Sequence, residues 1–119
     1  MESRQIRLSL PAEPQYARSV RMLAANLAAL CGMTIDDVED VRMAAEEGFV
    51  YSCATQGAEL DVTFAVAESQ IGIDFALGGE PEAAGEQAAY ARLLLEAVCD
   101  ECDLDEAGST LHLLKRTIA

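Results

Sequence analysis

Hydrophobic and polar residues alternate along residues 4–10, where Ile6, Leu8 and Leu10 are separated by polar neighbours. A period of two is typical of a strand with one buried face. Two prolines follow within a few positions and end the run, because proline cannot continue a hydrogen-bonded ladder. The chain is therefore predicted to open with a half-buried strand.

Two stretches with helical spacing come next. From Pro14 to about Gly32, apolar residues recur at every third or fourth position, and Gly32 is a natural C-terminal stop. A second helix is predicted from about Ile35 to Cys53, with Thr34 as its N-cap. The buried stripe predicted for this second helix consists of Val38, Val41, Ala45 and Phe49.

The remaining half of the chain alternates between strand-like and helix-like patterns. Residues 60–67 and 70–77 read as a hairpin, and the loop 78–85 is rich in residues that break secondary structure. A third helix is predicted from about Glu86 to Cys102, followed by an acidic run over 100–106. In the last strand, Leu111, Leu113 and Lys115 face one way and Thr110, His112 and Leu114 the other.

This order of elements predicts an α+β fold. By its length of 119 residues the chain forms one domain, residues 1–119. A two-layer sandwich is expected, in which helices cover one face of a mixed or antiparallel sheet.

The charge of the chain limits the kinds of partner that it can bind. Its formal net charge is -13, from 21 acidic and 8 basic residues. A phosphate backbone would be repelled, so direct binding of nucleic acid is not expected. A protein partner fits this charge better.

Nothing in the sequence points to export or to a membrane, so the protein is expected to be cytoplasmic. Cys31, Cys53, Cys99 and Cys102 are then expected to be reduced and buried. An alternative is a small metal-binding or redox protein that uses the CxxC of Cys99 and Cys102, in which case a thiol of lowered pKa or bound zinc is predicted.

The segment Val38–Thr55 carries the candidate chemistry. On a helix, Glu47 and Tyr51 share a face because they lie four residues apart, and Asp40 and Met43 follow the same side. This face is predicted to form a wall of any active site. His112 stands among leucines with no acidic partner in register, and it is interpreted as a structural or surface residue.

The stretches LPAEPQYARSVR, VEDVRMAAEE and AVCDECDLDEAGSTLHLLKR, taken in order, resemble the anti-sigma-factor serine kinases of bacterial partner-switching systems. This family has the histidine-kinase-like ATPase (GHKL, or Bergerat) fold, and the resemblance spans nearly the whole chain. It implies three sequence boxes that hold ATP and magnesium.

The first box places a glutamate and an asparagine at i and i+4 on the second helix. Glu47 matches the glutamate, which would be the general base, but Tyr51 stands at the asparagine position. A phenol is a poor ligand for Mg²⁺, which prefers carboxylate, carbonyl and water oxygens. Glu47 is therefore interpreted as a vestigial base, and Tyr51 is expected to fill the vacated space. Asp40 and Glu46 would be poor substitute ligands for the metal.

The second and third boxes depart from the family pattern as well. Leu77 occupies the position of the aspartate that would bind adenine, Gly79 keeps the first glycine, and Pro81 replaces the second. Asp74 is an alternative adenine ligand, although it alternates with buried residues. In the third box, Ala89 and Ala91 replace the glycines that would wrap the phosphates. The lid between these boxes is short.

These departures favour a regulatory protein that binds other proteins and needs no cofactor, with ATP binding and kinase activity lost. An active serine-protein kinase that uses ATP and magnesium is the alternative. The resemblance implies a sigma factor, a STAS-type anti-anti-sigma protein, or both as partners, and a homodimer. Arg18 and Arg21 on the first helix are candidate contact residues.

Overall fold

Residues 3–55, 58–78, 86–105 and 110–117 are described by the computed structural model of the chain. Within them, strands and helices alternate in the predicted order, with one added strand near the C-terminus. The elements are β1 (Arg4–Pro11), a 3-10 turn (Pro14–Tyr16), α1 (Ala17–Leu30), α2 (Ile35–Cys53), β2 (Glu59–Ala67), β3 (Gln70–Ala76), α3 (Glu86–Val98), β4 (Glu101–Leu104) and β5 (Thr110–Arg116).

The described strands form one sheet in the order β1-β2-β3-β5-β4, and every neighbouring pair is antiparallel. β5 follows β4 in the chain but lies between β3 and β4. The structure confirms the predicted α+β class, and the described part of the sheet is antiparallel rather than mixed.

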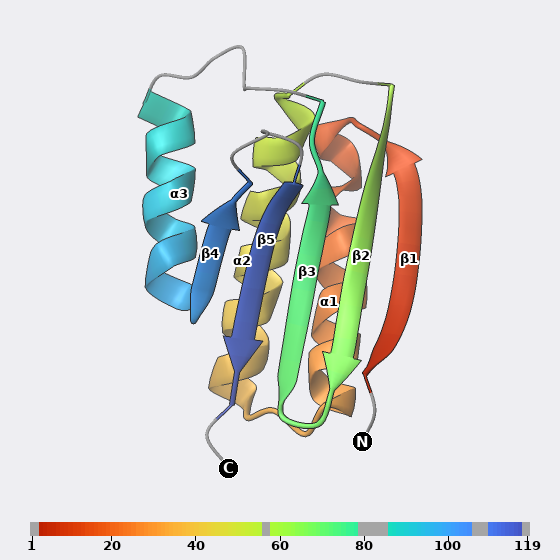
Figure 1. The fold of residues 1–119 in the computed structure, drawn as a ribbon, viewed down its shortest axis with the longest axis vertical. Coiled ribbons are helices and arrows are strands. Elements are labelled where there is room, and N and C mark those ends of the chain that lie inside the picture. The colour runs from red at the N-terminus through yellow and green to blue at the C-terminus, as the bar shows by residue number, and fades with distance from the viewer. Residues whose placement is uncertain (1–2, 56–57, 79–85, 106–109, 118–119) are drawn as a thin grey trace.

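The helices α1 and α2 lie side by side behind the sheet and cover one of its faces, while α3 stands beside α2 near β4 (Figure 1). Between the two layers lies an apolar core centred on the fully buried rings of Phe49, Phe64 and Phe75. Of the buried stripe predicted for α2, Val41, Ala45 and Phe49 are buried, and Val38 is half-buried. Among the described helices, none is long and apolar enough to cross a membrane.

The predicted extent of the third helix is wrong. α3 ends at Val98 instead of continuing to Cys102, and the Asp100 N–H donates to the Leu114 carbonyl of β5 at 2.8 Å. The acidic run contains a short strand, β4, whose Cys102 and Leu104 pair with the buried Leu113 and Leu111. With only two apolar side chains between acidic ones, this strand carries too weak a pattern to be recognised without its partner.

Gly48 brings α2 unusually close to the sheet. A Cβ atom added at this position would lie 2.6 Å from Cε2 and 2.8 Å from Cζ of Phe75, and 3.3 Å from a methyl carbon of Leu113. Since both neighbours are buried in a close-packed core, they have little room to move. The absence of a side chain at Gly48 therefore sets how closely the two layers pack.

We predict that Gly48→Ala lowers the free energy of unfolding by about 1–3 kcal/mol through overpacking, although alanine is the better helix former. Gly72→Ala is the matched control, because its added Cβ would meet only ordinary contacts at 3.7 Å. This control should change stability by no more than about 0.5 kcal/mol. Urea denaturation of both variants measures the difference, and a Gly48→Ala protein as stable as the wild type would contradict the packing argument.

Candidate functional site

The candidate site lies along α2, which begins at a regular N-cap. The Thr34 hydroxyl accepts a hydrogen bond from the Asp37 N–H at 3.1 Å, so the helix phase is set from its first turn. In this phase, Ala44 and Tyr51 are buried, while Met43 and Val50 are exposed. Glu47 lies between these two sides of the helix and is half-buried.

Among the described residues, Glu47 forms no hydrogen bond and no ion pair. Partial burial raises the pKa of its carboxyl, and the neighbouring charge of Glu46 raises it further. Glu46 itself lies 3.4 Å from Nη1 of Arg21 on α1. Glu47 is thus an uncompensated carboxylate on a partly apolar surface.

Tyr51, one turn after Glu47, belongs to the hydrophobic core. Its exposed fraction is 7%, although it carries the hydroxyl group that normally keeps a tyrosine at the surface. Leu77, at the position of the second box, is half-buried and packs against the same core. Both positions are therefore occupied by side chains that stabilise the interior.

A buried threonine connects the end of α2 to the end of β3. The Thr55 hydroxyl donates to the Ser52 carbonyl at 2.7 Å and accepts a hydrogen bond from the Gly78 N–H at 3.0 Å. Both Ser52 and Thr55 are fully buried. This pair of bonds holds the residue after Leu77 against α2, and sequence reasoning missed it because Thr55 and Gly78 are far apart in the chain.

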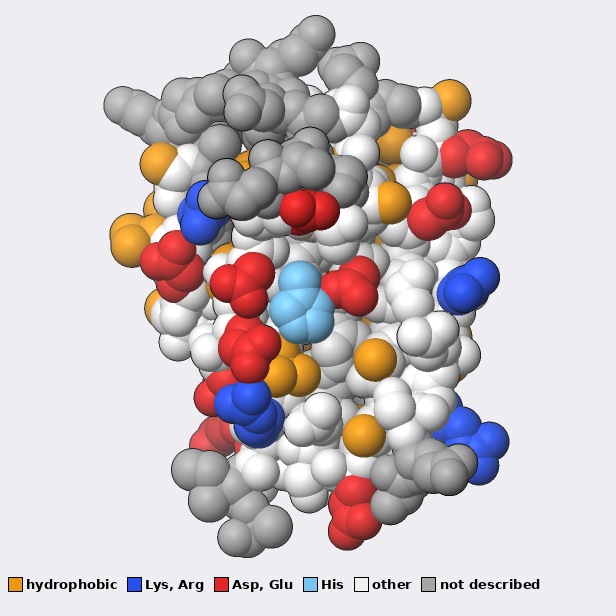
Figure 2. Space-filling view, in the orientation of Figure 1, with side chains coloured by type: hydrophobic (Ala, Val, Ile, Leu, Met, Phe, Trp, Pro, Cys, Tyr) orange, Lys and Arg blue, Asp and Glu red, His pale blue; other side chains and the backbone are white. Residues whose placement is uncertain are grey.

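The alternative adenine ligand, Asp74, lies on the other side of the sheet. It alternates with the buried Ile73 and Phe75, and its Oδ1 is 2.5 Å from Nδ1 of His112. His112 stands on the helix-free face in Figure 2, with acidic side chains on both sides. Asp74 therefore does not point toward α2.

The interpretation of His112 as lacking an acidic partner in register is wrong. Asp74 lies opposite it on β3 and Asp103 opposite it on β4, and Oε1 of Glu101 is 3.8 Å from its Nε2. Glu101 also binds Arg116, at 2.7 Å. The pairing of β5 with two acidic strands creates this cluster, which the sequence of a single strand does not reveal.

The third box is described only in part. Ala89 is exposed, and Ala91 is buried, with an exposed fraction of 7%, where α3 packs on the core. Gly79 and the short lid, residues 79–85, lie outside the described residues.

The acidic residues named as substitute metal ligands already have basic partners. Lys115 on β5 donates to Asp40 Oδ2 at 3.0 Å and to the Val98 carbonyl at 3.0 Å, and its Nζ lies 3.8 Å from Asp37. Burial alone would lower the pKa of Lys115, but the hydrogen bond and charge of Asp40, together with the charges of Asp37 and Asp100, outweigh it and raise the pKa. Lys115 thereby joins α2, the end of α3 and β5.

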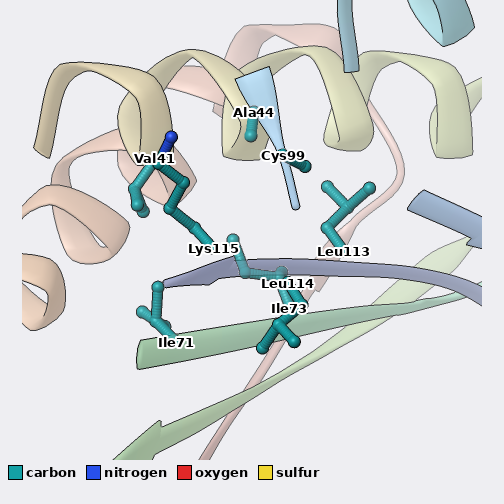
Figure 3. A pocket seen from close by; sticks show the side chains of 8 residues that line it. All are labelled: Val41, Ala44, Ile71, Ile73, Cys99, Leu113, Leu114 and Lys115. Atoms are coloured by element: carbon teal, nitrogen blue, oxygen red, sulfur yellow. The ribbon is translucent and has the colours of Figure 1, made fainter. Parts of the chain in front are cut away.

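Beside Lys115 lies a small apolar cavity of about 10 Å³. Figure 3 shows its lining, contributed by α2, β3, β5 and Cys99. Its volume is at the lower limit for one water molecule, and its walls offer few polar partners. The cavity is therefore a packing defect rather than a ligand site.

The cysteines do not have the properties that the redox alternative predicts. All four are free thiols; Cys31 is buried and the others are half-buried. Burial raises the pKa of Cys99 to about 12 and also raises the pKa of Cys102, which disfavours the reactive thiolate. In the part of the chain that the structure describes, no three His, Cys, Asp or Glu residues are placed to hold a metal ion.

Comparison with known proteins finds similarity both in sequence and in structure. The chain is 32% identical over 81 residues to serine-protein kinase RsbW of Bacillus velezensis, a match that covers 63% of this chain and 50% of the relative. The chain thus spans about half the length of that curated relative. No protein-family model matches.

Among solved structures, the chain is similar to the crystal structure of the RsbU and RsbW domains of Rv1364c from Mycobacterium tuberculosis. The TM-score is 0.73, the identity is 20%, and the match covers 95% of this chain and 32% of that one. At this identity the structural likeness shows the fold alone. The chain is thus similar in sequence to a serine-protein kinase over 81 residues and has the fold of the solved RsbW-domain structure.

Proposed function

We propose that this protein is a cytoplasmic anti-sigma-factor-like regulator of a bacterial partner-switching system, which acts by binding proteins and has lost ATP binding and kinase activity. The burial of Tyr51 carries this proposal. At the position where the related kinases place a magnesium ligand, the side chain is an aromatic ring that is 7% exposed and packed into the core.

The residues described at the ATP boxes do not fit a magnesium nucleotide. The phenol of Tyr51 replaces an amide oxygen, and hard Mg²⁺ prefers carboxylate, carbonyl or water oxygens. Leu77 cannot accept a hydrogen bond from adenine, and Asp74 lies on the helix-free face with His112. An adenine donor left unpaired costs about 1–3 kcal/mol of binding free energy. These features support a loss of nucleotide binding, so no catalytic step is assigned to Glu47.

The proposed partners are a sigma factor, a STAS-domain antagonist, or both, and the protein is proposed to act as a homodimer. Arg18 on α1 is exposed and forms no ion pair with any described residue. Arg21 is held by Glu46, and its buried Nε has no hydrogen-bond partner among the described residues. Arg18 is thus the more available of the two candidate contacts. The net charge of -13 favours fast encounter with a basic partner surface.

An active serine-protein kinase is the second candidate, and one observation favours it. The raised pKa of Glu47 moves this carboxyl toward the range in which a general base works at neutral pH. The relative from Bacillus velezensis is named as a serine-protein kinase. Nucleotide binding separates the two candidates.

We predict that Mg-ATP does not change the melting temperature of the protein. A nucleotide at a hundred times its dissociation constant would stabilise the folded state by about 2.7 kcal/mol, which a thermal melt readily detects. The melt is repeated with ADP and without magnesium. A clear upward shift with any of these ligands would overturn the proposed loss of nucleotide binding.

A second prediction concerns Tyr51 as a core residue. We expect Tyr51→Asn to lower the free energy of unfolding by about 3 kcal/mol, because it removes a buried ring and leaves a polar side chain in the core. The control is Tyr90→Asn on α3, the same chemical change at a position that is 63% exposed, where about 0.5 kcal/mol or less is expected. Equal stability losses in guanidinium denaturation would show that Tyr51 does not fill the interior.

A third prediction tests partner binding. Arg18→Glu should weaken binding to a sigma factor or STAS-domain protein of the same organism by about tenfold, because it reverses an exposed contact charge. Arg92→Glu makes the same charge change on α3, at a half-exposed position where Arg92 pairs with Glu96, and should leave affinity within about twofold of wild type. Calorimetry measures both, and a wild-type protein that binds neither partner would refute the proposed function.

A further inference from the structure

One face of α2 combines exposed apolar side chains with the carboxylate of Glu47. Met43 precedes Glu47 by four residues and Val50 follows it by three, so all three share the solvent side of the helix. Met43 is 40% exposed and Val50 is 41% exposed. We call these three residues the α2 ridge. Large apolar side chains grouped at a soluble surface are a mark of contact sites.

Glu47 differs from Glu39, Asp40 and Glu46 of α2 in having no partner among the described residues. Glu39 binds Arg42, Asp40 binds Lys115, and Glu46 binds Arg21. Glu47 is nevertheless half-buried between Ala44 and Tyr51 on one side and the exposed apolar pair on the other. A partly desolvated carboxylate without a cation is where an incoming cation gains most.

We propose that the α2 ridge docks an amphipathic segment of a partner protein, in which a lysine or arginine pairs with Glu47 and flanking apolar side chains cover Met43 and Val50. The inference rests on the proposed protein-binding function and adds the chemistry of the bound segment. A retained carboxylate of the former catalytic position thus becomes an anchor for recognition.

Charge complementarity selects this occupant over a second copy of the chain. A two-fold contact through the α2 ridge would bring Glu46 and Glu47 of one protomer close to the same residues of its partner, and like charges in contact cost binding energy. A basic segment would instead be attracted by the negative charges of Glu46 and Glu47.

The helix-free face of the sheet is acidic too, but none of the large exposed apolar side chains of the described residues lies on it. Its Asp74 and Glu101 are already engaged by His112 and Arg116. The large exposed apolar residues of the described chain lie on or next to the helices, and none lies on a strand. Burial of apolar area drives helix docking, so the α2 ridge is the better surface.

The test uses a synthetic helix-forming peptide of about 15 residues, with leucine along one face and lysine beside it, and a twin with glutamate for lysine. Amide shifts of the full chain are followed by NMR during titration. The lysine peptide should shift α2 around Glu47, and the pKa of the Glu47 carboxyl should fall, because the bound cation stabilises its charged form. The glutamate twin should leave these signals unchanged.

Matched variants separate a specific site from the general negative charge. Glu47→Gln and Val50→Ser should each weaken the lysine peptide about fivefold. Asp103→Asn on the helix-free face and Leu93→Ser on α3 make the same kinds of change elsewhere and should retain wild-type affinity. Circular dichroism verifies that all four variants are folded. An equal loss with Asp103→Asn, shifts centred on His112, or equal binding of the glutamate twin would each overturn the inference.

The same variants are then measured against a sigma factor and a STAS-domain protein. If one of them binds the wild type and Glu47→Gln weakens it about fivefold, the inference is supported. If one binds and Glu47→Gln has no effect, the inference fails while the proposed function stands. If neither binds while the lysine peptide maps to the α2 ridge, the proposed function fails instead.

Discussion

The close approach of α2 to the sheet is the constraint on which the rest of the site depends. It exists because Gly48 has no side chain where the Phe75 ring and Leu113 occupy the space. Once Gly48 faces the sheet, the helical period places Tyr51 in the interior and Glu47 at the border with solvent. A single packing contact thus determines which chemical groups of α2 can meet a ligand and which cannot.

The same contact bears on the proposed role of this fold in protein recognition. Tyr51 and Leu77 add buried apolar surface to the interior. A nucleotide pocket at the same place would instead contain polar groups that need a ligand to form hydrogen bonds. Hydrogen bonds of Thr55 and Lys115 join its elements from within. In the proposed function, the outer surface makes the contacts, and its charge and exposed apolar area determine the partner.

The sequence predicts the architecture well wherever one chain segment contains the whole signal. Neighbouring residues determine the period of β1, the N-cap of α2 at Thr34 and the position of the buried stripe of α2. β4 and the surroundings of His112 were missed for the opposite reason. Both features form only when β5 pairs with β3 and β4. Read alone, the acidic residues of those two segments resemble solvent-exposed surface residues. The burial of Tyr51 agrees with the expectation that its ring packs into the interior.

The placement of β5 also has a consequence for how the chain folds. β5 is later in the chain than β4, yet it supplies the only partner of β4 in the described sheet and completes β3. Until β5 docks, β3 presents an unpaired edge with Ile71, Ile73 and Phe75 on its inner side. Completion of the sheet therefore depends on contacts distant in sequence, which makes this step slow compared with formation of the α1–α2 hairpin. During that interval the free edge of β3 is the part of the molecule most prone to pair with another chain.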